Sequence, residues 1–146
     1  MKKNYFYTTV REEFSLLLTA VRSSSESEIQ SARKTCLFRH RGLCSHLLKD
    51  FITPIQRDDL YEISSSIFAV FSTLSHLSSV ERNRAEQSVL LLATDPFRFD
   101  ESMIRRREEL WNLWGDVSAL SPGGKECFFA LDRVAERLLL AAVRNA

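Results

Sequence analysis

The fold class is decided by the stretch Thr53-Pro54-Ile55-Gln56-Arg57-Asp58-Asp59-Leu60, which opens the best-marked helix of this 146-residue sequence. The Thr53 hydroxyl can cap the first turn, Pro54 lacks only an N–H that would be unpaired there, and Gln56 can reach back to the cap. Apolar residues then recur at three- and four-residue steps, which is typical of a helix with one buried face. The members of this stripe are Ile63, Ile67, Phe71, Leu74 and Leu77. We therefore expect a helix from Pro54 to about Leu77.

The same periodicity, followed outward from this stretch, predicts further helices and no strand. A first helix carries the apolar stripe of Phe6–Val21 and stops at a run of three serines. A second helix follows, in which Ser25 and Glu28 have the spacing of a capping box and the stripe continues to Phe51. The ranges expected toward the C-terminus are about Val80–Thr94, Asp100–Val117 and, after a Pro122-Gly123-Gly124 turn, Phe128–Ala142.

These helices predict an all-α protein. Only 4 glycines and 3 prolines occur, so the chain is interrupted rarely. Amphipathic helices joined by short loops imply antiparallel neighbours, so we expect an up-and-down bundle of about six helices, which can divide into two three-helix units. No linker is long enough to separate two domains, and residues 1–146 are expected to form a single helical-bundle domain.

Composition and charge argue against several classes of protein. Hydrophobic residues make up 45% of the chain and charged residues 27%, which excludes a disordered chain. The net charge of +1 gives no overall attraction to nucleic acid, and the longest wholly apolar run, Val89–Ala93, is too short to cross a bilayer. Three cysteines without a secretory signal predict reduced thiols in a cytoplasmic protein. Nucleophile-elbow, phosphate-loop and metalloprotease motifs are missing, so we do not expect an enzyme.

The stretch from His46 to Tyr61 resembles a known hinge sequence. It contains Phe51-Ile52-Thr53-Pro54 followed by Arg57, Asp58 and Asp59, and it is similar to the run between the second and third helices of the PhoU-like phosphate-transport regulators. The resemblance extends over about residues 33–72. It implies two three-helix repeats, a cytoplasmic and frequently dimeric protein, and action on phosphate transporters or their partner kinases. It also implies divalent metals held by carboxylates four residues apart on a helix.

The residues present depart from the family's metal-binding pattern. Thr35 and Leu37 supply no carboxylate before the hinge, and Phe68 and Ala69 stand where the resemblance implies an acidic pair. We therefore expect the first metal site of the family to be lost.

Other candidate ligands remain along the chain. Near the start of the third helix lie Asp58, Asp59 and Glu62. We interpret these three as acids that the helix dipole favours. The candidate metal ligands in the second half are Glu108, Asp132 and Glu136, with Asn112 where the family has an acid. Their few oxygens suit Mg²⁺ or Ca²⁺ poorly, so we interpret them as solvated acids and expect no cofactor. The alternative is a residual divalent metal held by these residues. A soft-ligand set of Cys36, His40 and Cys44 is interpreted as core packing.

The fifth predicted helix is apolar over a wide arc, formed by Leu110, Trp111, Leu113 and Trp114. This arc is a candidate partner surface and could join two copies of the chain in a homodimer. The alternative is that both tryptophans lie inside the bundle.

Taken together, these features predict a divergent, shortened PhoU-like regulator that acts by protein–protein contact. Its expected partner is a phosphate transporter or the regulator of one. The alternative is a free-standing helical adaptor or effector protein whose hinge only converges on the motif.

Overall fold

The computed structural model describes residues 2–42, 53–93 and 101–144, and every regular element within these ranges is a helix. The elements are α1 (Lys2–Arg22), α2 (Glu26–Gly42), α3 (Pro54–Thr73), η2 (Leu74–His76), α4 (Ser79–Ala93), α5 (Glu101–Trp114), η3 (Val117–Ala119) and α6 (Pro122–Arg144). The predicted all-α class is confirmed. None of the helices in the described ranges is both long and apolar enough to cross a bilayer.

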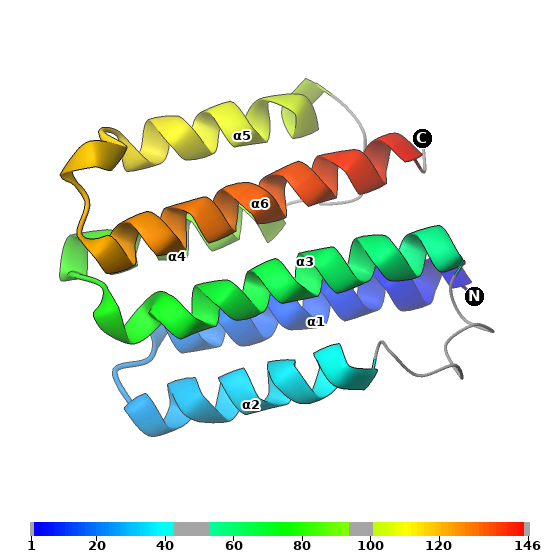
Figure 1. Ribbon diagram of the computed structural model, residues 1–146, viewed down its shortest axis with the longest axis horizontal. Coiled ribbons are helices and arrows are strands. Elements are labelled where there is room, and N and C mark those ends of the chain that lie inside the picture. Colours follow the sequence, from blue (N-terminus) through cyan, green and yellow to red (C-terminus); the bar gives the residue numbers. More distant parts are fainter. Residues whose placement is uncertain (1, 43–52, 94–100, 145–146) are drawn as a thin grey trace.

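Successive helices run in opposite directions, so the chain forms the predicted up-and-down bundle (Figure 1). The helices α5, α6, α3 and α2 lie side by side in one layer, with α4 behind α6 and α1 behind α3. The first three helices pack against one another, and so do the last three; the two groups meet where α3 packs along α6 and α1 against α4. Two three-helix units therefore share an interface with α3 and α6 at its centre.

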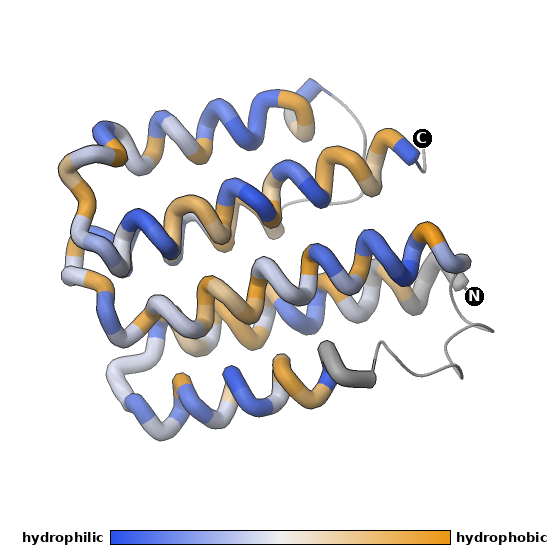
Figure 2. Tube along the Cα trace, viewed as in Figure 1, coloured by the Kyte–Doolittle hydropathy of each residue, from blue (hydrophilic) through white to orange (hydrophobic). Residues whose placement is uncertain are grey.

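The core of the bundle draws apolar side chains from all six α-helices. Hydrophobic and hydrophilic residues alternate along α3 and α6, as expected when one face of each helix is buried (Figure 2). The buried faces of the two units form one continuous cluster, which includes Phe14, Ile63, Leu92, Leu110 and Phe128.

The starts of α2 and α3 follow the predicted capping chemistry. The Gln56 amide donates to the Thr53 hydroxyl at 3.1 Å, and the Thr53 amide donates to the Gln56 side chain at 3.1 Å, so this capping box is complete. In α2 the Glu28 amide donates to the Ser25 hydroxyl at 3.3 Å. The Glu28 carboxylate accepts from the Ser23 hydroxyl instead of the Ser25 amide, so the second box is only half formed.

A third capping box, which the sequence analysis missed, fixes the start of α4. The Glu81 amide donates to the Ser78 hydroxyl at 3.2 Å, and the Ser78 amide donates back to the Glu81 carboxylate at 3.0 Å. The same carboxylate accepts from the amide and hydroxyl of Ser121, which caps α6 through the Gly124 amide. These hydrogen bonds hold the pKa of Glu81 below its usual value, against the opposing effect of burial.

The fifth helix ends earlier than predicted. The expected stripe reached Val117, but α5 stops at Trp114 because Gly115 has a φ of 70°, a left-handed conformation that glycine adopts without a steric penalty. The Gly115 amide donates to the Trp111 carbonyl and closes the helix end. Val117 then lies in the short 3-10 helix η3, which Asp116 caps.

The Pro122-Gly123-Gly124 segment was predicted to be a turn and is instead the first turn of α6. Its glycines allow this helix end to approach its neighbours closely. A Cβ atom on Gly123 would lie 2.9 Å from the His76 carbonyl oxygen, and one on Gly124 would lie 2.1 Å from a carboxylate oxygen of Glu81. The glycines therefore serve packing between helix ends and do not break the helix.

Parts of the predicted second and fifth helices lie outside the described residues. They include the stripe beyond Gly42 that was predicted to reach Phe51, and the predicted cap at Asp100.

Candidate functional site

The antiparallel helices α3 and α6 border two open cavities on the surface of the bundle. We call them together the α3–α6 groove. Its charged end has a volume of about 470 Å³ and lies between the N-terminal half of α3 and the C-terminal half of α6. Its aromatic end has a volume of about 610 Å³ and lies between the opposite halves of the same helices.

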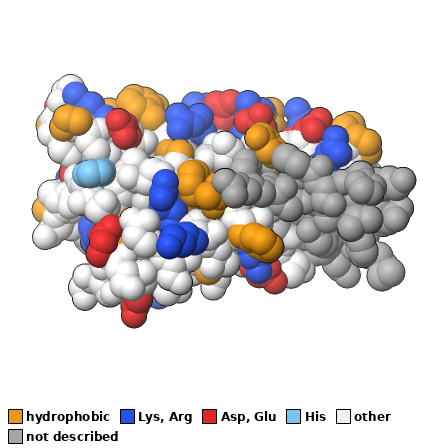
Figure 3. Space-filling model, turned by 60° about the horizontal axis from the view of Figure 1, so that its bottom comes forward, with side chains coloured by type: hydrophobic (Ala, Val, Ile, Leu, Met, Phe, Trp, Pro, Cys, Tyr) orange, Lys and Arg blue, Asp and Glu red, His pale blue; other side chains and the backbone are white. Residues whose placement is uncertain are grey.

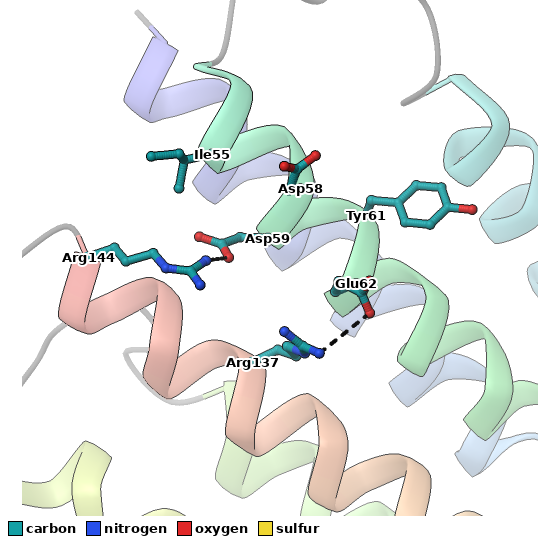
Figure 4. A pocket seen from close by; sticks show the side chains of 7 residues that line it. All are labelled: Ile55, Asp58, Asp59, Tyr61, Glu62, Arg137 and Arg144. Atoms are coloured by element: carbon teal, nitrogen blue, oxygen red, sulfur yellow. Dashed lines mark hydrogen bonds and ion pairs between the residues drawn. The ribbon is translucent and has the colours of Figure 1, made fainter.

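Two ion pairs join α3 and α6 across the charged end (Figure 4). Asp59 and Arg144 point toward one another from α3 and α6 and form a salt bridge. One turn further along α3, Glu62 lies 3.9 Å from a guanidinium nitrogen of Arg137. Tyr61 points away from α6 in this view. The basic groups that line this end thus already face acids of the same chain.

Asp59 is the most buried of these acids, with 3% of its surface exposed. One carboxylate oxygen meets Arg144, and the other has no hydrogen-bond partner among the described residues. The acids of this stretch were interpreted as favoured by the helix dipole, but none of them lies in the first turn of α3. Their pairing with α6 replaces that interpretation for Asp59 and Glu62.

The residues of the predicted hinge motif lie in different environments. Thr53 and Pro54 form the start of α3, Arg57 and Asp58 are exposed, and Asp59 is buried at the charged end. Phe51 and Ile52 lie outside the described residues.

The aromatic end combines two phenylalanines with two cations. Phe129 of α6 is 43% exposed, and Phe68 of α3 is half-buried. Lys125 and Arg133 stand one turn before and one turn after Phe129 on the same side of α6, and all three line the cavity. Neither cation forms an ion pair within the described part of the chain. The α3 side of this cavity is lined mainly by small side chains, those of Ser65, Ala69, Ser72 and Thr73.

A cation from α2 packs on one of the two aromatic rings that line this end. The Arg33 guanidinium lies 4.9 Å from the centre of the Phe68 ring, which is a cation–π distance. Viewed with the α2 side turned forward, the surface shows Lys and Arg side chains next to hydrophobic ones near its middle (Figure 3).

The candidate metal ligands are not brought together as a metal-binding group. Asp132 accepts two hydrogen bonds from the Arg107 guanidinium, at 2.7 and 2.8 Å, and one from the Trp111 indole at 2.9 Å. Glu136 lies 3.3 Å from the same guanidinium, and Glu108 is exposed. Among the described residues no cluster of three or more carboxylate, histidine or cysteine side chains is placed to hold a metal ion.

Asp132 was predicted to be a solvated acid and is instead 7% exposed. Burial by itself raises the pKa of Asp132, but the hydrogen bonds from Arg107 and Trp111 outweigh it and lower the pKa. This carboxylate therefore ties α6 to α5.

The predicted partner surface on α5 is wrong for two of its four residues. Leu110 and Trp114 are fully buried, and the Trp114 indole donates to the Ser88 hydroxyl at 2.8 Å. Trp111 remains 42% exposed, with its ring edge-to-face against Phe128 at 4.7 Å, and Leu113 is half-buried. The helix α5 packs against both α4 and α6. Its buried face is therefore wider than that of a helix with a single neighbour, which accounts for much of the wide apolar arc.

Of the predicted soft-ligand set, Cys36 is fully buried, and burial raises the pKa of its thiol to about 12. The side chain of His40 and the whole of Cys44 lie outside the described residues.

The sequence analysis missed a buried acid at the centre of the first three-helix unit. Glu13 of α1 is 0% exposed and accepts a hydrogen bond from the Ser64 hydroxyl of α3 at 2.8 Å. Its second oxygen has no hydrogen-bond partner in the described ranges. Burial raises the pKa of Glu13 to about 7, although Ser64 and Arg39 oppose this. The periodicity contained the signal, because Glu13 falls three residues after Val10 and four before Leu17, within the apolar stripe.

Comparison with protein-family models, with curated proteins and with solved structures finds no match to this chain. The resemblance to the PhoU-like regulators therefore stays a prediction.

Proposed function

We propose that this protein is a regulatory binding module, and that it acts by docking a partner protein in the α3–α6 groove. The observation that carries this proposal is the aromatic end, where half-exposed Phe129 lies between Lys125 and Arg133 and both cations lack an ion pair within the described ranges. Exposed aromatic side chains beside arginine are typical of residues that dominate protein–protein binding. The proposed role is non-catalytic.

The partner we propose is a cytoplasmic phosphate transporter component or its regulator, as the resemblance of the hinge implies. The division of the bundle into two three-helix units supports this proposal, because the resemblance implies that arrangement. The capping box at Thr53 and Gln56 supports it as well, since it lies within the resembling stretch. The second candidate is an adaptor protein with a different partner, which the same groove would serve. Exposed Trp111 leaves a homodimer through α5 as a further proposal.

Site-directed photo-cross-linking in the native cells tests the proposal. A benzoylphenylalanine is placed at Phe129, at Ser72 across the groove, or at Val80, an exposed control on α4 of the other layer. We expect the same discrete product from the two groove positions and not from Val80, with the partner identified by mass spectrometry. A phosphate transporter or its kinase in that product supports the PhoU-like proposal, and any other protein supports the adaptor.

A chain that gives no product from either groove position, or identical products from all three positions, does not bind a partner in this groove. A gene neighbouring an inorganic phosphate transporter would support the first candidate independently.

A further inference from the structure

We propose that the aromatic end of the groove receives an amphipathic helix with acidic residues, contributed by the partner protein. This inference rests on the proposed function and assigns the chemistry of the partner segment.

The shape of the aromatic end suits a helix laid along it. On α6 the wall is a straight stripe, Lys125, Phe129 and Arg133, at steps of four residues. The floor on α3 is made mainly of small side chains, of which Ser65 and Ala69 are one turn apart, and Phe68 is the one large residue on that side. A low floor beside an aromatic wall allows the apolar face of an incoming helix to approach closely, as in helix-in-groove recognition.

The charge of the aromatic end specifies an acidic partner. Its lining includes the cations Lys125 and Arg133 and the single acid Glu126. At the charged end, by contrast, Arg137 and Arg144 already face acids of α3. Within the groove, the positive charge that is not paired with an acid therefore lies at the aromatic end.

The spacing of the cations defines the spacing of the acids. Lys125 and Arg133 are eight residues apart on α6, so their Cα atoms are separated by about 12 Å along the helix axis. Acids seven or eight residues apart on the incoming helix would lie beside both cations. Arg33 packs over the ring of Phe68, but it does not itself line the cavity, so only Lys125 and Arg133 set this spacing.

The test uses a fluorescein-labelled amphipathic peptide of about 18 residues, long enough for about 27 Å of helix. It carries leucines on one face and glutamates eight residues apart at the edge of that face; the control peptide has lysine in place of each glutamate. Fluorescence anisotropy with the full chain is expected to give at least tenfold tighter binding of the acidic peptide, and binding should weaken as salt is raised.

Matched variants then locate the site. Arg133→Glu should weaken binding of the acidic peptide at least tenfold and strengthen binding of the lysine peptide, whereas Arg105→Glu, the same charge change on α5, should alter neither. Phe129→Ala should weaken binding of both peptides, whereas Phe38→Ala, at an exposed phenylalanine outside the groove, should not. Thermal melts of each variant verify that it is folded.

Equal binding of the two peptides, or equal loss for Arg133→Glu and Arg105→Glu, would overturn the inference. Binding to phosphatidylglycerol vesicles that depends on Arg133 and Phe129 while the acidic peptide does not bind would also overturn it, and would assign the surface to lipid. If cross-linking at Phe129 yields a protein partner but the acidic peptide fails to bind, the proposed function stands and only this inference falls.

Discussion

Replacing Glu13 by glutamine should remove a loss of stability that the wild-type protein undergoes as the pH rises. Glu13 is fully buried, and its pKa is raised to about 7 from an ordinary value of 4.5, chiefly by burial. The folded chain therefore holds a proton that the unfolded chain has released between those values, and the free energy of unfolding falls across that window. For one such carboxyl the loss between pH 5 and pH 8 is about 2.5 kcal/mol.

The groups that act on Glu13 identify the controls. Glu12 adjoins it on α1, Ser64 donates to it from α3, and Cys36 and Arg39 act on it from α2. The thiol of Cys36 stays protonated throughout, because burial raises its pKa to about 12. Every other ionisable group is common to the wild type and Glu13→Gln, so the remaining pH dependence cancels in the difference between the two proteins.

Urea denaturation at several pH values from 5 to 8 measures this difference. We expect Glu13→Gln to gain stability relative to the wild type by about 2.5 kcal/mol from pH 5 to pH 8, because the amide keeps an acceptor for Ser64 and cannot ionise. Two curves that stay parallel over the whole range would show that Glu13 does not titrate there, and the argument from its burial would be refuted.

Four further outcomes follow from the described contacts. Thr53→Ala should cost about 1 kcal/mol of stability in urea denaturation while Thr53→Ser costs less, because serine keeps the capping hydroxyl; no loss in either variant would contradict the cap. Gly124→Ala should cost about 1–3 kcal/mol, since its Cβ would lie 2.1 Å from a Glu81 oxygen, and an unchanged melting temperature would show that this carboxylate moves freely. Asp132→Ala should cost about 2 kcal/mol near neutral pH, and this difference should shrink as the pH falls below the ordinary pKa of 3.8, because the Arg107 and Trp111 hydrogen bonds favour the ionised form. Elemental analysis of the purified protein should find no stoichiometric iron or zinc, because Arg107 already occupies both oxygens of Asp132.

The helices could be predicted from the sequence because their signals are local. A stripe of apolar residues and a cap such as Thr53 with Gln56 act within a few residues of one another, and the start of α3 was predicted correctly. The start of α4 at Ser79 was within reach as well, because Ser78 and Glu81 repeat the spacing of Ser25 and Glu28.

The errors concern contacts between residues far apart in the chain. Gly123 and Gly124 were predicted to form a turn. Their packing role could not be seen in the sequence, because the residues that they approach, His76 and Glu81, come more than 40 residues earlier. Asp59 and its partner Arg144 are separated by 85 positions, and no pattern within the third helix predicts this ion pair.

The candidate site shows the same limit. The sequence singled out Leu110, Trp111, Leu113 and Trp114 as one surface, but it could not tell which of them α4 and α6 would cover. The sequence also did not reveal the groove. Its aromatic end, which includes Lys125, Phe129 and Arg133, forms only when α6 packs along the small residues of α3.

The carboxylate of Glu81 accepts hydrogen bonds from the starts of two helices, α4 and α6. An end of a helix normally frays by itself, and its amides exchange with solvent deuterium independently of other helices. Here the first turn of α6 loses the acceptor for Ser121 whenever the first turn of α4 opens. The two ends therefore belong to one cooperative unit, and the amides of Ser78 and Ser121 should exchange through a shared opening although 43 positions separate them.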